Sequence, residues 1–174
     1  MIGTLGGVCR LFLVLIFLVA ACSPGPEAPP IAGSEVVCAP SFCIAHPDGW
    51  EVEIGDTYIS FRHPVAPESA FATIGFTNPE AVVTAAGETW PANNETVARS
   101  FWALLEETEV GTLDRLERLP GGNIRSYGGY QDGRMWALLV PTDEGRAVGV
   151  EVRGPNQGWE AHADVFFSTV ELVP

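Results

Sequence analysis

Glycine and proline interrupt this chain so often that they limit its fold more than any other feature of the sequence. The 174 residues include 19 glycines and 14 prolines, about a fifth of the chain where ~12% is usual. Each of these residues favours a turn over the continuation of a long helix or strand. The pattern therefore favours short strands and loops over a helical bundle.

The amino-acid composition limits the classes of partner that the chain can bind. The chain has nine arginines, no lysine and 22 acidic residues, which gives a formal net charge of −13. Binding to nucleic acid needs clustered basic residues, so no nucleic-acid partner is expected. The same deficit argues against docking on anionic lipid through a basic patch. With 47% hydrophobic residues the chain is too apolar to be disordered, and its length suits one domain.

The first 22 residues have the sequence pattern of a targeting segment. Leu11–Ala21 is an unbroken apolar run behind Arg10; it is shorter than the ~20 residues of a transmembrane helix and has the length of the apolar part of a signal peptide. The run ends in Val19-Ala20-Ala21-Cys22, which resembles the lipobox of bacterial lipoproteins. That resemblance implies cleavage before Cys22, a diacylglycerol thioether on its sulfur, and acylation of the new N-terminus.

The lipobox sets the expected organisation of the chain: a signal peptide over 1–21, a Pro/Gly-rich tether over 22–37, and one domain over 38–174. The tether is expected to be a semi-extended spacer because it is rich in proline. A lipid-anchored protein of this kind lies on the extracytoplasmic face of a bacterial membrane, inner or outer. The alternative is an ordinary secretory signal cut after Ala21, which leaves Cys22 a free thiol.

Cys38 and Cys43 enclose four residues and form a candidate disulfide. Outside the cytoplasm such a pair normally oxidises. Free thiols, or a redox or metal site, are the alternatives. A redox pair usually has the spacing C-x-x-C, and a metal site needs further ligands where only His46 is near.

Alternating apolar and polar residues between turn signals predict strands. They follow a short apolar stretch at 42–46 and are expected at 50–54, 57–63, 69–77, 113–119, 124–131, 134–141 and 146–153. A short helix can begin at Pro79. A longer one begins near Asn94, with Val97, Phe101, Leu104 and Leu105 on its apolar face, and a last helix spans about 159–170. This order predicts an α+β fold, in which an antiparallel sheet of six to seven strands packs with a central and a C-terminal helix.

The turn Pro47-Asp48-Gly49-Trp50, which follows the first apolar stretch, resembles the opening of the PsbP/Mog1-like fold. The order of a central helix, a strand meander and a C-terminal helix extends this resemblance over about 38–174. It implies that Trp50 is a core residue. It also implies a mostly non-catalytic role, as an accessory subunit at a membrane complex, a transport cofactor or a small lipoprotein.

The sequence shows no motif for catalysis, for cofactor binding or for metal binding. The sequence lacks a nucleophile elbow, a phosphate-binding loop, a zinc motif and a calcium loop, so no catalytic residue, cofactor or metal ligand is predicted. His46 and His63 each precede a proline and are expected to be exposed beside turns. His162 is expected beside the apolar stripe of the last helix.

Two further features of the sequence each allow two interpretations. Trp90 and Trp102 are expected to be core residues, with an exposed aromatic patch as the alternative. Glu106, Glu107 and Glu109 form an acidic cluster late in the central helix. It is either a solvated face or a contact for a cationic partner.

The sequence therefore predicts a membrane-anchored, non-enzymatic lipoprotein that binds a protein partner. The alternative is a lipoprotein that binds a small ligand or a metal for a transporter, with a pocket between sheet and helix lined by tryptophan. An enzyme would instead show titratable groups converging in a cleft.

Overall fold

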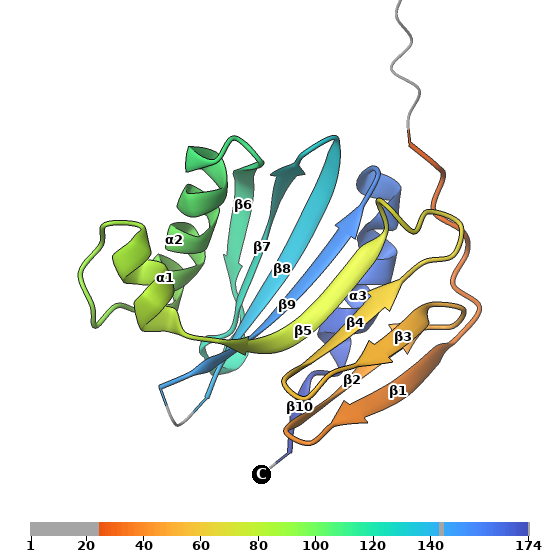
Figure 1. Cartoon of the computed structure of the whole chain (residues 1–174), viewed down its shortest axis with the longest axis horizontal. Helices are drawn as coiled ribbons and strands as arrows, with labels where there is room; N and C mark the ends of the chain where they lie inside the picture. Colours follow the sequence, from red (N-terminus) through yellow and green to blue (C-terminus); the bar gives the residue numbers. More distant parts are fainter. Residues whose placement is uncertain (1–24, 143–144, 174) are drawn as a thin grey trace, which may run out of the picture.

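The computed structural model describes residues 25–142 and 145–173 (Figure 1). Within them no helix has both the length and the apolar character needed to cross a membrane. The strands are β1 (Ser34–Ala39), β2 (Phe42–Pro47), β3 (Glu51–Ile54), β4 (Tyr58–Arg62), β5 (Phe71–Thr77), β6 (Gly111–Arg118), β7 (Ile124–Tyr130), β8 (Gly133–Pro141), β9 (Ala147–Gly154) and β10 (Glu171–Leu172). The helices are α1 (Pro79–Ala85), α2 (Asn94–Glu107) and α3 (Glu160–Ser168).

Seven of these strands form an antiparallel sheet in the order β3-β4-β5-β9-β8-β7-β6. Short turns join most neighbours, and the expected hairpin at Asp132-Gly133 connects β7 to β8, with Tyr130 opposite Gly133. The pairing of β5 with β9 brings the first and second halves of the chain into one sheet. The predicted α+β fold with an antiparallel sheet and two main helices is confirmed.

A second sheet was not expected. It has three strands in the order β1-β2-β10, so the apolar stretch at 42–46 pairs outside the large sheet. The end of the chain completes it, with Glu171 opposite Cys43. Strand β1 begins at Ser34, four residues before the expected start of the domain at Cys38, because residues 34–37 pair with β2.

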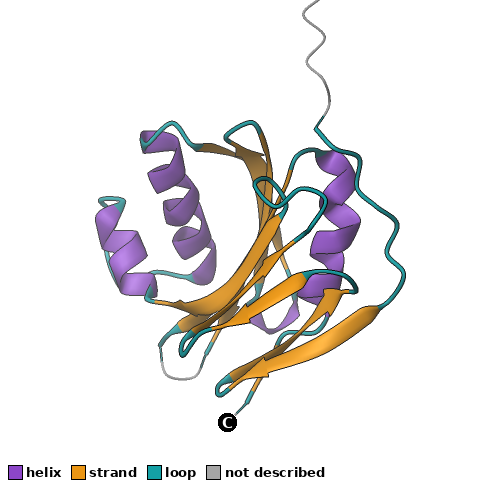
Figure 2. Cartoon of the chain, turned by 45° about the vertical axis from the view of Figure 1, so that its right-hand side comes forward, coloured by secondary structure: helices purple, strands orange, loops and turns teal. Residues whose placement is uncertain are grey.

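The helices lie on opposite faces of the seven-stranded sheet (Figures 1 and 2). Helix α2 packs over β6, β7 and β8, whereas α3 packs between β2 and strands β8 and β9. The main core is on the α3 side. There the Phe166 ring lies 5.0 Å from that of Phe61 and 5.2 Å from that of Trp50, between centroids. Trp50 is buried, as the PsbP/Mog1-like resemblance implies.

Helix α2 begins where the sequence predicts, with the Asn93 side chain accepting a hydrogen bond from the Thr96 amide. Its buried side differs by one position from the expected stripe. Trp102 is only 1% exposed, while Phe101 is half-buried. The Trp102 indole donates to Ser126 Oγ at 2.9 Å and fits over Gly128, where a Cβ would lie 2.8 Å from the ring. The alternative of an exposed patch at Trp102 is therefore wrong.

The proline-rich segment before β1 lies along the domain beside α3 (Figure 2). Asn156 Nδ2 donates to the carbonyl of Gly25 at 3.0 Å, and Trp159 Nε1 donates to that of Pro26 at 3.1 Å. The carbonyl of Pro29 lies 2.9 Å from His162 Nε2. Residues 25–29 are thus docked rather than a free spacer, because proline leaves its carbonyl available to such donors.

Candidate functional site: an arginine-lined pocket

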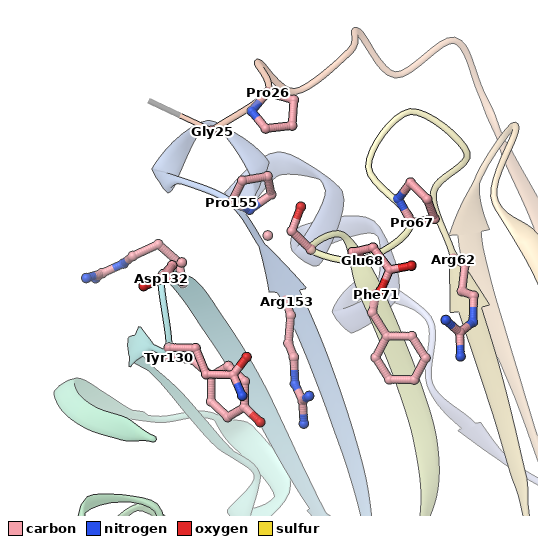
Figure 3. A pocket seen from close by; sticks show the side chains of 15 residues that line it. Gly25, Pro26, Arg62, Pro67, Glu68, Phe71, Tyr130, Asp132, Arg153 and Pro155 are labelled. Atoms are coloured by element: carbon pink, nitrogen blue, oxygen red, sulfur yellow. The ribbon is translucent and has the colours of Figure 1, made fainter. Parts of the chain in front are cut away.

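A pocket of about 560 Å³ opens at one end of the seven-stranded sheet (Figure 3). Its volume falls in the range of ligand-binding clefts. It is lined by residues of the β4–β5 loop, the β7–β8 turn, the end of β9 and the docked segment at Gly25 and Pro26. Segments from four parts of the chain therefore meet at this site.

Strand register places two arginines and a phenylalanine in one row across the sheet. Phe71 on β5 is opposite Arg62 on β4 and opposite Arg153 on β9. Residues directly opposite each other share a face, and Figure 3 shows the three side chains side by side. The guanidinium carbons of Arg62 and Arg153 lie 5.5 and 5.9 Å from the Phe71 ring centroid.

This row lies on the sheet face that α2 covers only in part. Side chains along β9 alternate between faces, so Arg153 shares a face with Glu151 and Gly149. Those two residues line a small hollow beneath α2. Because α2 packs on β6 to β8, the row at β4, β5 and β9 stays open to solvent.

Arg153 is held in place mainly by aromatic rings. Its guanidinium carbon lies 4.2 Å from the Tyr130 ring centroid, and its Nη2 donates to Glu151 Oε2 at 3.1 Å. Its Nε is buried and has no hydrogen-bond partner among the described residues. A guanidinium has five N–H donors, so most of the capacity of Arg153 remains unused.

The other charged groups of the lining differ in their pairing. Arg134 Nη2 forms an ion pair with Asp114 Oδ2 at 2.6 Å. Arg62, Glu68 and Asp132 make no ion pair with any described residue. The pocket thus gathers three of the nine arginines of an acidic chain, together with two unpaired carboxylates.

The lining suits binding better than reaction. Arginines fixed by aromatic rings can hold a phosphate or a carboxylate through paired N–H donors. No histidine or cysteine lines the pocket, so the Ser–His and Cys–His arrangements of nucleophilic catalysis are not formed there.

The three histidines lie elsewhere and are buried, with exposed fractions of 3% for His46, 6% for His63 and 3% for His162. The expectation that His46 and His63 are exposed beside turns is wrong. Both side chains point from strand ends into the packed α3 face, where His46 contacts Phe61 and His63 contacts Trp159.

His63 and His162 form a cluster with Trp50 and Trp159. The Trp50 indole donates to His162 Nδ1 at 3.3 Å, so His162 carries its proton on Nε2 and donates it to Pro29. The Val65 amide donates to His63 Nδ1 at 3.2 Å. Burial lowers the pKa of His63, and nearby His162 lowers that pKa further.

The structure places the predicted site residues apart from the pocket. Cys38 and Cys43 form the expected disulfide across the β1–β2 hairpin, with their Cα atoms 4.1 Å apart. Cys22 lies outside the described residues, and its lipidation stays a prediction. Glu106, Glu107 and Glu109 are exposed at the end of α2.

The tryptophan-lined pocket expected for a ligand-binding lipoprotein is not where it was predicted. The hollow between α2 and the sheet holds about 50 Å³ and has no tryptophan in its lining. The described residues also contain no group of three or more His, Cys, Asp or Glu that could hold a metal ion.

Sequence reasoning missed Arg62, Phe71 and Arg153. Each of these residues lies near one end of a predicted strand, and that was the signal available in the sequence. The three residues come together only because β5 pairs with both β4 and β9, and β9 is far from the other two strands in the sequence. Local periodicity carries no information on such long-range pairing.

Comparisons with known proteins bear on the fold. No family model and no curated protein sequence matches the chain. The solution structure of cyanobacterial PsbP (CyanoP) from Synechocystis sp. PCC 6803 superposes with a TM-score of 0.55 and 11% identity, over 86% of this chain and 99% of that one. A crystal structure from Bacteroides thetaiotaomicron VPI-5482 has a TM-score of 0.40 and 14% identity, over 76% of this chain and 45% of that one. The described domain thus has a PsbP-like α+β fold.

Proposed function

We propose that this protein is a lipid-anchored accessory module on the extracytoplasmic face of a bacterial membrane, that it binds a protein partner, and that it catalyses no reaction. The PsbP-like fold carries this proposal, because it agrees with a non-enzymatic accessory role. The lipobox-like Val19–Cys22 adds the anchor.

The docked segment limits how far the domain can stand from its anchor. Gly25 is already hydrogen-bonded to the domain, three residues after Cys22. Three extended residues span at most ~11 Å. A lipid on Cys22 would hold this end of the domain close to the membrane surface, and acyl chains in pairs anchor stably.

The net charge of the chain also favours a covalent lipid, rather than a basic patch, as the means of attachment to the membrane. Removal of residues 1–21 takes away Arg10 and leaves eight arginines against 22 acidic residues, a formal charge of −14. Such a body is repelled by anionic headgroups. The anchor must therefore supply the membrane affinity.

A second candidate function is binding of a small ligand for a transporter. The arginine-lined pocket of about 560 Å³ favours it. The accessory and ligand-binding roles are compatible, because a protein partner could receive a small ligand that is bound in the pocket.

Photo-crosslinking in cells tests the proposed partner. The chain has no lysine, so amine-reactive reagents find no side chain; a photoreactive amino acid at an exposed position is needed instead. Val36, Tyr58 and Val65 are exposed apolar residues suited to this, and buried Ile74 is the control. We expect one discrete protein adduct that is lost in Cys22→Ala. The absence of an adduct from all three exposed positions would contradict a protein partner.

A further inference from the structure

We infer that the arginine-lined pocket binds a zwitterionic headgroup of the phosphoethanolamine type, with the phosphate on Arg62 and Arg153 and the ammonium on Glu68. This inference goes beyond the proposed accessory role.

The phosphate side is built by the row across β4, β5 and β9. Arg62 has no ion-pair partner among the described residues, and Arg153 uses only Nη2, toward Glu151. Both guanidinium groups flank the Phe71 ring, and Arg153 is also placed by the Tyr130 ring and by Glu151. Planar, fixed guanidinium groups match the oxygens of a phosphate better than flexible ammonium groups do.

The ammonium side is built by Glu68. This residue belongs to the β4–β5 loop and lines the pocket, and its carboxylate makes no ion pair with any described residue. Figure 3 shows the Glu68 side chain over the Phe71 row, between Arg62 and Arg153. A purely anionic ligand would face the Glu68 carboxylate with like charge, whereas an ammonium group next to a phosphate pairs with it.

The place of the pocket favours a lipid headgroup as the source of this chemistry. Gly25 and Pro26 form part of the lining, and they follow Cys22 by three and four residues. This step rests on the proposed lipid anchor: with it, the pocket rim lies within ~11 Å of the acylated cysteine. The mature charge of −14 disfavours anionic lipid, and a zwitterionic headgroup avoids that repulsion.

The test uses the chain from Ser23 to Pro174, which holds every described residue and no lipid. The first probe is O-phosphoethanolamine, titrated by calorimetry beside inorganic phosphate and ethanolamine. The second is co-sedimentation with phosphatidylcholine vesicles that contain either phosphatidylethanolamine or phosphatidylglycerol. The variants are Arg62→Gln, Arg153→Gln and Glu68→Gln. Arg99→Gln, on α2 outside the pocket lining, is the matched control.

We expect O-phosphoethanolamine to bind more tightly than inorganic phosphate or ethanolamine. Arg62→Gln should weaken it by about tenfold or more, as expected for a lost charge-assisted hydrogen bond, and Glu68→Gln should remove the preference over inorganic phosphate. Arg99→Gln should bind like the parent. Because Arg62 is exposed, its replacement leaves the core intact even if Arg153→Gln folds poorly.

Three results would overturn the inference. Equal binding of inorganic phosphate would reduce the site to a general anion site. Binding of the soluble probe without sedimentation on phosphatidylethanolamine vesicles would assign it to a soluble phosphate ester. Equal co-sedimentation with phosphatidylglycerol vesicles would show that the site does not select a zwitterionic headgroup. None of these results concerns Cys22, since the tested chain has no anchor; the anchor is tested separately in cells.

Discussion

Trp102 and Phe101 are neighbours in α2 that contribute differently to stability. Trp102 is almost fully buried and satisfies its indole N–H on Ser126. Phe101 lies at the edge of the helix and contacts the Trp102 ring, with their centroids 6.1 Å apart. A periodicity of 3.6 residues identifies a buried side but not its centre, and here the larger ring occupies the centre.

Trp102→Ala should therefore lower the free energy of unfolding by about 3–5 kcal/mol, the range for a truncated buried aromatic residue. Phe101→Ala should cost clearly less, because half-buried side chains lose less contact. Urea unfolding of the two variants measures this, with exposed Ala103→Ser as the control. Equal losses for the two aromatic variants would contradict the burial described for α2.

His63 makes stability depend on pH. Its pKa is lowered in the folded protein by burial and by nearby His162, so the unfolded chain binds a proton more readily. The stabilising contribution is then fully present above the unfolded pKa of ~6.5 and is lost as pH falls below it.

We expect the free energy of unfolding to fall between pH 7 and pH 5, and less steeply in His63→Asn. The asparagine oxygen can still accept from the Val65 amide, which bonds to His63 Nδ1 at 3.2 Å, but it does not titrate. Urea unfolding at several pH values checks this. An unchanged slope in the variant would show that His63 is not responsible.

At the scale of elements, the predictable part of the fold is local. Turn signals and alternation located the strands of the seven-stranded sheet, and the spacing of apolar residues located α2, whose first turn is capped by Asn93. Strand β1 was missed because its residues follow a proline-rich run that resembles a spacer. The burial of His46 and His63 was missed because a proline after a histidine indicates the end of a strand but not which face the side chain occupies.

The β1–β2 hairpin depends on its disulfide to a modest extent. Closing a loop this short restricts the unfolded chain by roughly 2 kcal/mol. The double variant Cys38→Ser, Cys43→Ser should unfold at lower urea by a corresponding amount and keep the rest of the fold. Intact mass of the parent before and after reduction gives a direct check, with a gain of two hydrogens expected. No gain in mass would mean that the thiols are free.

The docked segment should also stabilise the domain. A chain that starts at Ile31 loses the carbonyls that accept from Asn156 and Trp159 and the Pro29 carbonyl beside His162. At ~1 kcal/mol for each hydrogen bond, the loss should be about 1–3 kcal/mol. Thermal unfolding of the two chains compares them. An unchanged midpoint would show that residues 25–29 add nothing to the fold.

At the scale of the whole molecule, the docked segment and the arginine-lined pocket lie together. The chain enters beside the pocket, and its C-terminus lies at the opposite end of the domain (Figure 1). The pocket, with three of the nine arginines in its lining, therefore lies beside the first described residues. The proposed lipid on Cys22 would connect this end of the domain to the membrane.

Fractionation of cells that express the full chain or its Cys22→Ala variant tests that connection most directly. We predict that the parent is processed and recovered with membranes, whereas Cys22→Ala is released in soluble form or remains an unprocessed precursor. Cys38→Ser is the control for loss of a cysteine elsewhere and should fractionate like the parent. A Cys22→Ala protein that is processed and membrane-bound like the parent would contradict the lipid anchor.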